Sequence, residues 1–121
     1  MQLQESGEMY LETILILSRR MERVRAIDVG EAMGFSKPSV SRAMSILRSG
    51  GFVSLSEDGC LLLTDCGREV AERTYERHTL LTRFFTDLGV SADTAAADAC
   101  RIEHVISEES FQAIKKKMVD R

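Results

Sequence analysis

The chain has 121 residues, 44% hydrophobic and 29% charged, a balance typical of one globular domain or two small ones. No apolar run approaches the roughly 18 residues that span a bilayer, and the N-terminus lacks a secretory signal, so we expect neither membrane insertion nor export. Three cysteines (Cys60, Cys66 and Cys100) cannot all pair within one chain and match no zinc module, which favours a reducing cytoplasm; Cys60 and Cys66 are expected to be packing residues.

The net charge of −3 is unusual for a nucleic-acid-binding protein, but the charge is distributed unevenly along the chain. Between residues 19 and 48 there are seven basic and three acidic residues, whereas the remainder is acidic. This distribution is compatible with a phosphate-facing module joined to an acidic body. An ordinary solvated helix surface explains it equally well.

The first half of the chain predicts three helices followed by a β-hairpin. Apolar spacing indicates helices over residues 6–22, 26–33 and 37–49. Two β-prone runs, 52–56 and 60–64, flank the pair Asp58-Gly59, which is a typical hairpin turn. Between the second and third helices, Gly34 and the Ser36 cap predict a tight turn. This order of elements predicts a winged helix-turn-helix.

In a winged helix-turn-helix, the third helix enters the major groove of DNA with its N-terminal residues at the base edges. Small hydroxyls there can form hydrogen bonds with phosphates or bases, and Arg42 can form a bidentate hydrogen bond with guanine. The candidate DNA-binding residues are Arg25, Ser36, Lys37, Pro38, Ser39, Ser41 and Arg42. The hairpin tip is acidic at Glu57 and Asp58, so we expect little phosphate binding from the wing. A helical domain with an ordinary polar surface is the alternative.

The second half of the chain predicts helices only. Thr64 is a plausible cap for a long helix through about residue 88, and Gly89 ends that helix. Ser91 begins a fifth helix, over about 91–106, and Ser107 begins a sixth. The fold class is therefore mainly α with a small β-hairpin wing.

The segment CRIEHVIS carries a candidate metal-binding cluster. Positions i, i+3 and i+4 of a helix share a face, so Cys100, Glu103 and His104 would offer sulfur, oxygen and nitrogen donors together. That mixture suits a first-row divalent transition metal. A buried thiol, a surface carboxylate and a hydrogen-bonded imidazole are the ordinary alternative. Further candidate ligands are Met9 and Glu12 in the first helix and His78 in the fourth, although Met9 and His78 could equally be core residues.

Five motifs occur in order along nearly the whole chain: EMYLETI, SKPSVSRAM, LTDCGREVAE, RH at 77–78, and CRIEHVIS. Together they resemble the metal-dependent repressors typified by the diphtheria toxin repressor and the manganese transport regulator. The resemblance implies a homodimer with a DNA-binding domain over residues 1–72 and a helical dimerisation and metal-binding domain over residues 73–121. It places a metal site between the two domains. From its length we expect the chain to lack the SH3-like domain that many iron-type members append.

Carried over by position, the resemblance implies a hybrid ligand set. Iron-type members have primary ligands at the positions of Met9, Cys100, Glu103 and His104, and manganese-type members add those of Glu12 and His78. The sulfur donors favour Fe(II), with Mn(II) next. Ala96 and Thr82 stand where iron-type members hold an ancillary ion, and Cys100 stands where manganese-type members have a bridging carboxylate. We therefore expect one divalent ion per subunit.

The expected function is metal-activated repression of metal-homeostasis genes in the cytoplasm, with operator DNA and a second copy as partners. The main alternative is a winged-helix regulator that needs no metal and uses the cluster structurally. A metal-dependent or thiol enzyme would need a nucleophile elbow or cofactor fingerprint, which the sequence lacks, so we expect no organic substrate. A metal carrier would leave the recognition-helix features without a use.

Overall fold

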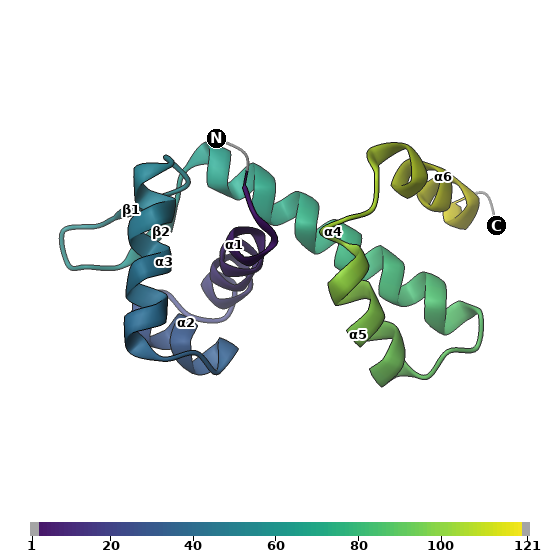
Figure 1. Cartoon of the computed structure of the whole chain (residues 1–121), viewed down its shortest axis with the longest axis horizontal. Coiled ribbons are helices and arrows are strands. Elements are labelled where there is room, and N and C mark those ends of the chain that lie inside the picture. The colour runs from purple at the N-terminus through teal and green to yellow at the C-terminus, as the bar shows by residue number, and fades with distance from the viewer. Residues whose placement is uncertain (1–2, 120–121) are drawn as a thin grey trace. The chain divides into compact units, whose positions relative to one another are not determined.

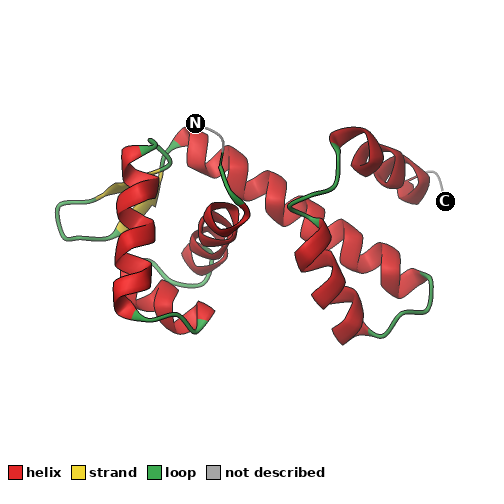
Figure 2. Cartoon of the chain, viewed as in Figure 1, coloured by secondary structure: helices red, strands yellow, loops and turns green. Residues whose placement is uncertain are grey.

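A computed structural model describes residues 3–119 of the chain. Its elements are α1 (Glu5–Ser18), α2 (Ala26–Met33), α3 (Lys37–Ser49), β1 (Val53–Leu55), β2 (Leu61–Leu63), α4 (Asp65–Asp87), α5 (Ala92–Ile102) and α6 (Glu108–Val119) (Figures 1 and 2). The mainly helical class with a small hairpin is confirmed. The chain divides into two compact units, the first ending at Glu72 and the second beginning at Arg73, within α4. Within the described range, no helix is both long and apolar enough to cross a lipid bilayer.

The first unit is built around a largely apolar centre. Helices α1, α2 and α3 contact one another, and the hairpin strands contact α1 and α3. The side chains they share are almost fully buried: Leu11, Ile14, Leu15, Val29, Val40 and Leu47. Removing such side chains from water is the main stabilising term in a small domain. This burial orients α3 so that one side of the helix faces the core and the other faces solvent.

The turns of the first unit follow the local signals in the sequence. Gly34 ends α2 in the left-handed conformation with φ +73°, which a residue with a Cβ adopts at a cost. Ser36 then caps α3 by accepting a hydrogen bond from Ser39 N, at 3.4 Å. In the hairpin, Gly59 has φ +83°, and Val53 pairs with Leu63 across the two strands. The predicted helix-turn-helix and hairpin turn are thus confirmed.

Helix α1 is shorter than predicted, because it ends at Ser18 rather than at residue 22. The Ser18 hydroxyl donates to the Leu15 carbonyl at 2.7 Å at the end of the helix. A few residues later Val24 is buried, and its carbonyl accepts a hydrogen bond from Leu61 N of β2 at 2.7 Å. The chain must leave the helix to place Val24 beside the hairpin, so a contact remote in sequence sets this helix end.

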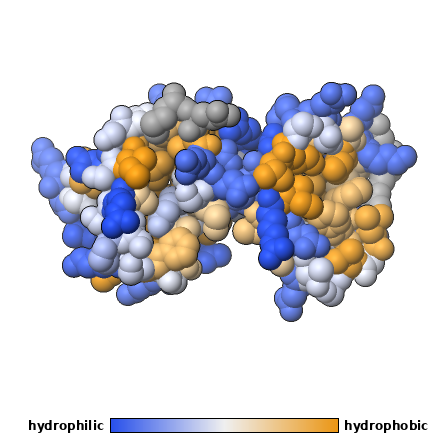
Figure 3. Space-filling model, viewed as in Figure 1, coloured by the Kyte–Doolittle hydropathy of each residue, from blue (hydrophilic) through white to orange (hydrophobic). Residues whose placement is uncertain are grey.

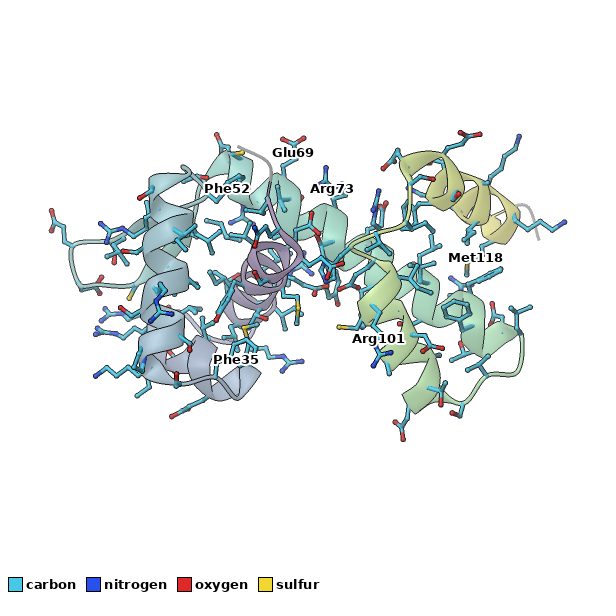
Figure 4. All side chains as sticks on the ribbon, viewed as in Figure 1. Phe35, Phe52, Glu69, Arg73, Arg101 and Met118 are labelled. Atoms are coloured by element: carbon cyan, nitrogen blue, oxygen red, sulfur yellow. The ribbon has the colours of Figure 1, made fainter. Side chains whose placement is uncertain are left out.

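The first turn of α4 packs directly on the loop that precedes β1. Thr64 Oγ1 donates to the Gly51 carbonyl at 2.7 Å and accepts from Gly67 N at 3.1 Å, so Thr64 caps α4 as predicted. A Cβ on Gly67 would lie 2.0 Å from the carbonyl oxygen of Phe52, which is labelled in Figure 4. Only glycine fits at this contact. The neighbouring Cys66 faces solvent, because Gly67 occupies the inward side of the turn.

The cysteine predictions divide accordingly. Cys60, immediately before β2, is buried, as expected of a packing residue. The same prediction for Cys66 is wrong, since that side chain is exposed. Within residues 3–119, none of the cysteines forms a disulfide.

The second unit consists of the rest of α4 with α5 and α6. Gly89, with φ +103°, ends α4, and Ser91 caps α5 by accepting from Thr94 N at 3.4 Å. The buried side chains of this unit are small or few: Thr74, Leu81, Ala95, Ala99 and Phe111, with one carboxylate, Glu103. Helix α5 ends at Ile102 rather than at residue 106, so the predicted length of the fifth helix is wrong. Residues 103–106 instead form a turn.

Candidate metal centre and DNA-binding surface

A buried carboxylate lies at the end of α5 in the second unit. The side chain of Glu103 is fully buried at the C-terminal end of α5. Its Oε2 lies 2.9 Å from Nδ1 of His78, which comes from α4. Its Oε1 lies 3.2 Å from Nε2 of His104, a side chain that is only 3% exposed. The fold therefore brings together three of the predicted ligands from two separate segments.

The Glu103 carboxylate carries its charge inside the protein. Burial alone would raise the pKa of Glu103, but the side-chain contacts from His104 and His78 outweigh burial and hold that pKa below its usual value. Among the described residues, neither carboxylate oxygen accepts a hydrogen bond of ordinary geometry, although both imidazoles are close. A buried carboxylate with one ring nitrogen beside each of its oxygens is a donor set that a divalent cation satisfies. The residues present thus fit a metal ion.

The sequence predicted that the three donors of the CRIEHVIS segment lie on one helix. In the structure they do not. Glu103 keeps a helical backbone conformation, and its N–H donates to the Ala99 carbonyl at 2.9 Å. Cys100 is half-buried in the last turn of α5, three residues before Glu103. His104 belongs to the turn that follows and approaches the second oxygen of Glu103 from there. Of the three, only Cys100 therefore lies within α5, while Glu103 caps the helix and His104 lies in the turn.

Arg77 explains why α5 ends where it does. Its Nη1 donates to the carbonyl of Glu103 at 3.2 Å and to the carbonyl of Ile106 at 2.9 Å. The guanidinium thus satisfies backbone acceptors that a longer helix would have used internally. Arg77 is the first residue of the RH pair in the sequence, but no role was predicted for its side chain. In the sequence it is indistinguishable from a surface arginine, because its burial depends on a turn 26 or more residues away.

The two remaining candidate ligands belong to the first unit. Glu12 lies on α1 with only 9% of its surface exposed, which is low for a carboxylate. Met9, three residues earlier on α1, is half-buried, and its carbonyl accepts a hydrogen bond from the Thr13 hydroxyl at 2.9 Å. Neither residue is an ordinary surface side chain.

The candidate DNA-binding residues lie on the solvent side of α3 and at the start of α2. One side of α3 faces the core, where it buries the side chains of Val40, Met44 and Leu47. The candidates on the opposite side are all exposed: Ser36, Lys37, Pro38, Ser39, Ser41 and Arg42, with Arg25 at the start of α2. Besides capping α3, Ser36 donates to the Ser39 hydroxyl at 2.9 Å. The side chains of Lys37, Ser41 and Arg42 therefore form the accessible edge of α3.

The acidic hairpin tip is held by the first unit's own side chains. Asp58 accepts a hydrogen bond from the Ser56 hydroxyl, and its Oδ2 lies 3.4 Å from Nη1 of Arg23. The Ser56 contact first, and Arg23 to a smaller degree, hold the pKa of Asp58 below its usual value. The hairpin tip therefore presents a negative charge to solvent.

Two family models match adjoining parts of the chain. The N-terminal DNA-binding domain of iron-dependent repressors matches residues 2–61, and their metal-binding and dimerisation domain matches residues 64–120. The transcriptional regulator MntR of Escherichia coli is 32% identical over 106 residues, which are 88% of this chain and 68% of that protein. The diphtheria toxin repressor of Corynebacterium diphtheriae is 31% identical over 117 residues, which are 96% of this chain and 52% of that protein.

A solved structure of the manganese regulator SloR has the same fold. It superposes with a TM-score of 0.83 at 29% identity, covering 93% of this chain and 53% of that one. The chain therefore belongs to the iron-dependent repressor family, although it spans only about half the length of several relatives. It combines the DNA-binding domain of these transcriptional repressors with their metal-binding and dimerisation domain. Its partners are operator DNA and a second copy of the chain.

The surface of the second unit is consistent with dimerisation. Figure 3 shows hydrophobic side chains gathered over much of the visible face of this unit. Several of its large apolar residues are well exposed: Leu88 (64%), Val105 (69%) and Val119 (74%). A groove along α4 and α6 is lined by Leu80 and by Met118, which is labelled in Figure 4. Exposed apolar patches of this kind are typical of protein–protein interfaces.

Proposed function

We propose that each subunit binds one divalent transition metal ion and represses metal-homeostasis genes in the cytoplasm, where its operator DNA is found. The observation that carries this proposal is the buried Glu103 carboxylate with His78 and His104 at its two oxygens. The proposed ligands are Met9, Glu12, His78, Cys100, Glu103 and His104. Glu12 and Met9 would supply the ligands of the first unit.

The donor set favours Fe(II), with Mn(II) next. Met9 and Cys100 bring soft sulfur atoms, which suit iron better than manganese, while the carboxylates suit both. A single ion is supported by the residues at the ancillary positions. Ala96 has no donor atom, and the Thr82 hydroxyl donates to the His78 carbonyl of its own helix at 2.7 Å.

The proposed mechanism couples the ligands to the recognition helix. Ligands on α1 belong to the DNA-binding unit, and ligands on α4, in α5 and in the turn after α5 belong to the dimerisation unit. Sharing one ion would limit the orientations that α3 can take relative to the dimer axis. Operator half-sites have a set separation, so DNA accepts a narrow range of these orientations. Bound metal and operator DNA would then favour the same conformer, with a coupling free energy of about 1–3 kcal/mol.

At the operator, we propose that the exposed edge of α3 supplies the specific contacts. Arg42 can donate two parallel hydrogen bonds to a guanine edge, while Lys37 and Arg25 suit phosphates. The hydroxyls of Ser39 and Ser41 suit either phosphates or bases. The acidic hairpin tip would contribute little.

Operator binding with and without metal tests the proposal. The double variant Cys100→Ala/His104→Ala should lose the stimulation of operator binding by Fe(II) or Mn(II), measured anaerobically with buffered free ion. Cys66→Ala is the matched control, because that thiol is exposed and lies outside the proposed ligand set. Stimulation that survives in the double variant rules out this site. Operator affinity that a chelator does not change would favour the metal-independent regulator, and two ions per subunit would refute the single site.

A further inference from the structure

The side chain of Arg77 joins three segments of the second unit. Arg77 lies in α4, immediately before His78, and its side chain is 12% exposed. Nη1 donates to the carbonyls of Glu103 and Ile106, the first and last residues of the turn between α5 and α6. Nη2 donates to Oε2 of Glu108 at 2.8 Å, at the start of α6. One guanidinium therefore bridges α4, the turn and α6.

The two carbonyl contacts of Arg77 act on the backbone that carries the proposed ligands. Glu103 begins the turn, and His104 lies between the two carbonyls that Nη1 holds. His78 is the next residue after Arg77 in α4, so its backbone moves with the helix that anchors the arginine. Charge-assisted hydrogen bonds are short, directional and roughly twice as strong as neutral ones. Sliding the turn along α4 would break both of them.

The α6 side holds the guanidinium in place. Its Cζ lies 5.4 Å from the ring centroid of Phe111, the buried side chain of α6. Glu108 accepts from Gln112 as well as from Arg77, and these contacts hold the pKa of Glu108 below its usual value. The Glu108 carboxylate is therefore ionised at neutral pH and remains a partner for the arginine. The planar fork thus has a fixed orientation toward the turn.

We propose that Arg77 is a positioning residue for the metal centre, which sets His78, Glu103 and His104 at their mutual distances before an ion binds. This inference rests on the proposed metal site. A residue that only stabilised the helix end would lower the stability of the protein without a specific effect on metal affinity. A positioning residue lowers the affinity of the folded protein for metal, as outer-sphere partners of metal ligands do.

Mn(II) titration of folded, metal-free protein tests the role of Arg77. In Arg77→Met we expect the affinity to fall about 10- to 100-fold, the usual cost of losing a residue that supports metal ligands. Arg77→Lys should recover part of the loss, because an ammonium keeps the charge but lacks the planar fork. Lys115→Met is the matched control, since Lys115 also links α6 to α4, through Glu76 at 3.3 Å, without contacting the turn.

Hydrogen exchange of the metal-free protein gives a second readout. The amides of Val105 and Ile106 both donate to the Ile102 carbonyl. They should exchange faster in Arg77→Met and at the wild-type rate in Lys115→Met. Glu108→Gln keeps both carbonyl contacts and should show a smaller loss of affinity in the same direction, which keeps the inference testable if Arg77→Met does not fold.

Three results overturn the inference, and one reference variant separates it from the proposed function. Wild-type Mn(II) affinity in Arg77→Met, an equal loss in Lys115→Met, or unchanged exchange of the turn amides would each exclude a positioning role. His104→Ala is the reference. If it weakens Mn(II) binding while Arg77→Met does not, only the role of Arg77 fails. If His104→Ala binds Mn(II) as the wild type does, the metal site itself is refuted.

Discussion

The two units of the molecule bury different kinds of side chain. The centre of the first unit is apolar, with residues such as Leu11 and Leu15 fully buried. The second unit buries the Glu103 carboxylate and nearly buries His104, while its apolar core consists largely of alanines and single large residues. Apolar burial stabilises a domain without a charged partner or a bound ion, whereas a buried charge is stable only when its partners are in place. We therefore expect the first unit to be a constant scaffold for α3 and the second unit to respond to a cation.

The largest change in the free energy of unfolding should come from shortening a side chain in the apolar centre of the first unit. Leu15→Ala should lower the free energy of unfolding by about 2–5 kcal/mol, because it removes buried methyl groups and leaves a cavity. Urea unfolding measures this loss, and Ile46→Ala is the control, since Ile46 is 55% exposed. The loss should be the same with and without Mn(II). A loss that Mn(II) abolishes would contradict the division of roles between the units.

The reverse experiment removes a charge from the second unit. Glu103→Gln keeps the size of the side chain but loses the anionic oxygens that an ion needs. Wild-type protein should gain about 2.7 kcal/mol of stability when free Mn(II) is 100 times its dissociation constant, and Glu103→Gln should gain much less. Thermal or urea unfolding with and without Mn(II) measures the difference, with the exposed Glu109→Gln as control. Equal stabilisation of variant and wild type would show that Glu103 does not bind metal.

The smallest effect on stability is expected at the accessible edge of α3. Arg42→Ala should change the free energy of unfolding by less than about 0.5 kcal/mol, because the side chain is exposed. Operator affinity should nevertheless fall about 10- to 100-fold, the cost of about 1–3 kcal/mol for a lost bidentate base contact. Fluorescence anisotropy with labelled operator measures this, and the exposed Lys116→Ala of α6 is the control. A comparable loss in Lys116→Ala would point to non-specific electrostatics instead.

Local signals predicted the first unit more closely than the second. The left-handed Gly34, the Ser36 cap and the Gly59 turn each depend on the backbone preferences of a few neighbouring residues, and each appears in the structure. Helix ends that depend on remote contacts were missed. Helix α1 stops early because Val24 must reach β2, and α5 stops early because Arg77 binds the carbonyls that follow it. No pattern in a single segment contains those partners.

The sequence by itself determined the order of elements, the helix-turn-helix with its hairpin, and the residue types able to bind a metal, because propensity, capping and apolar spacing act over a few residues. Tertiary structure alone decided that Glu103 is fully buried with His78 and His104 at its oxygens. It also decided that Arg77 binds the turn between α5 and α6. Burial and long-range hydrogen bonds exist only after segments separated by about 25 or more residues have packed together.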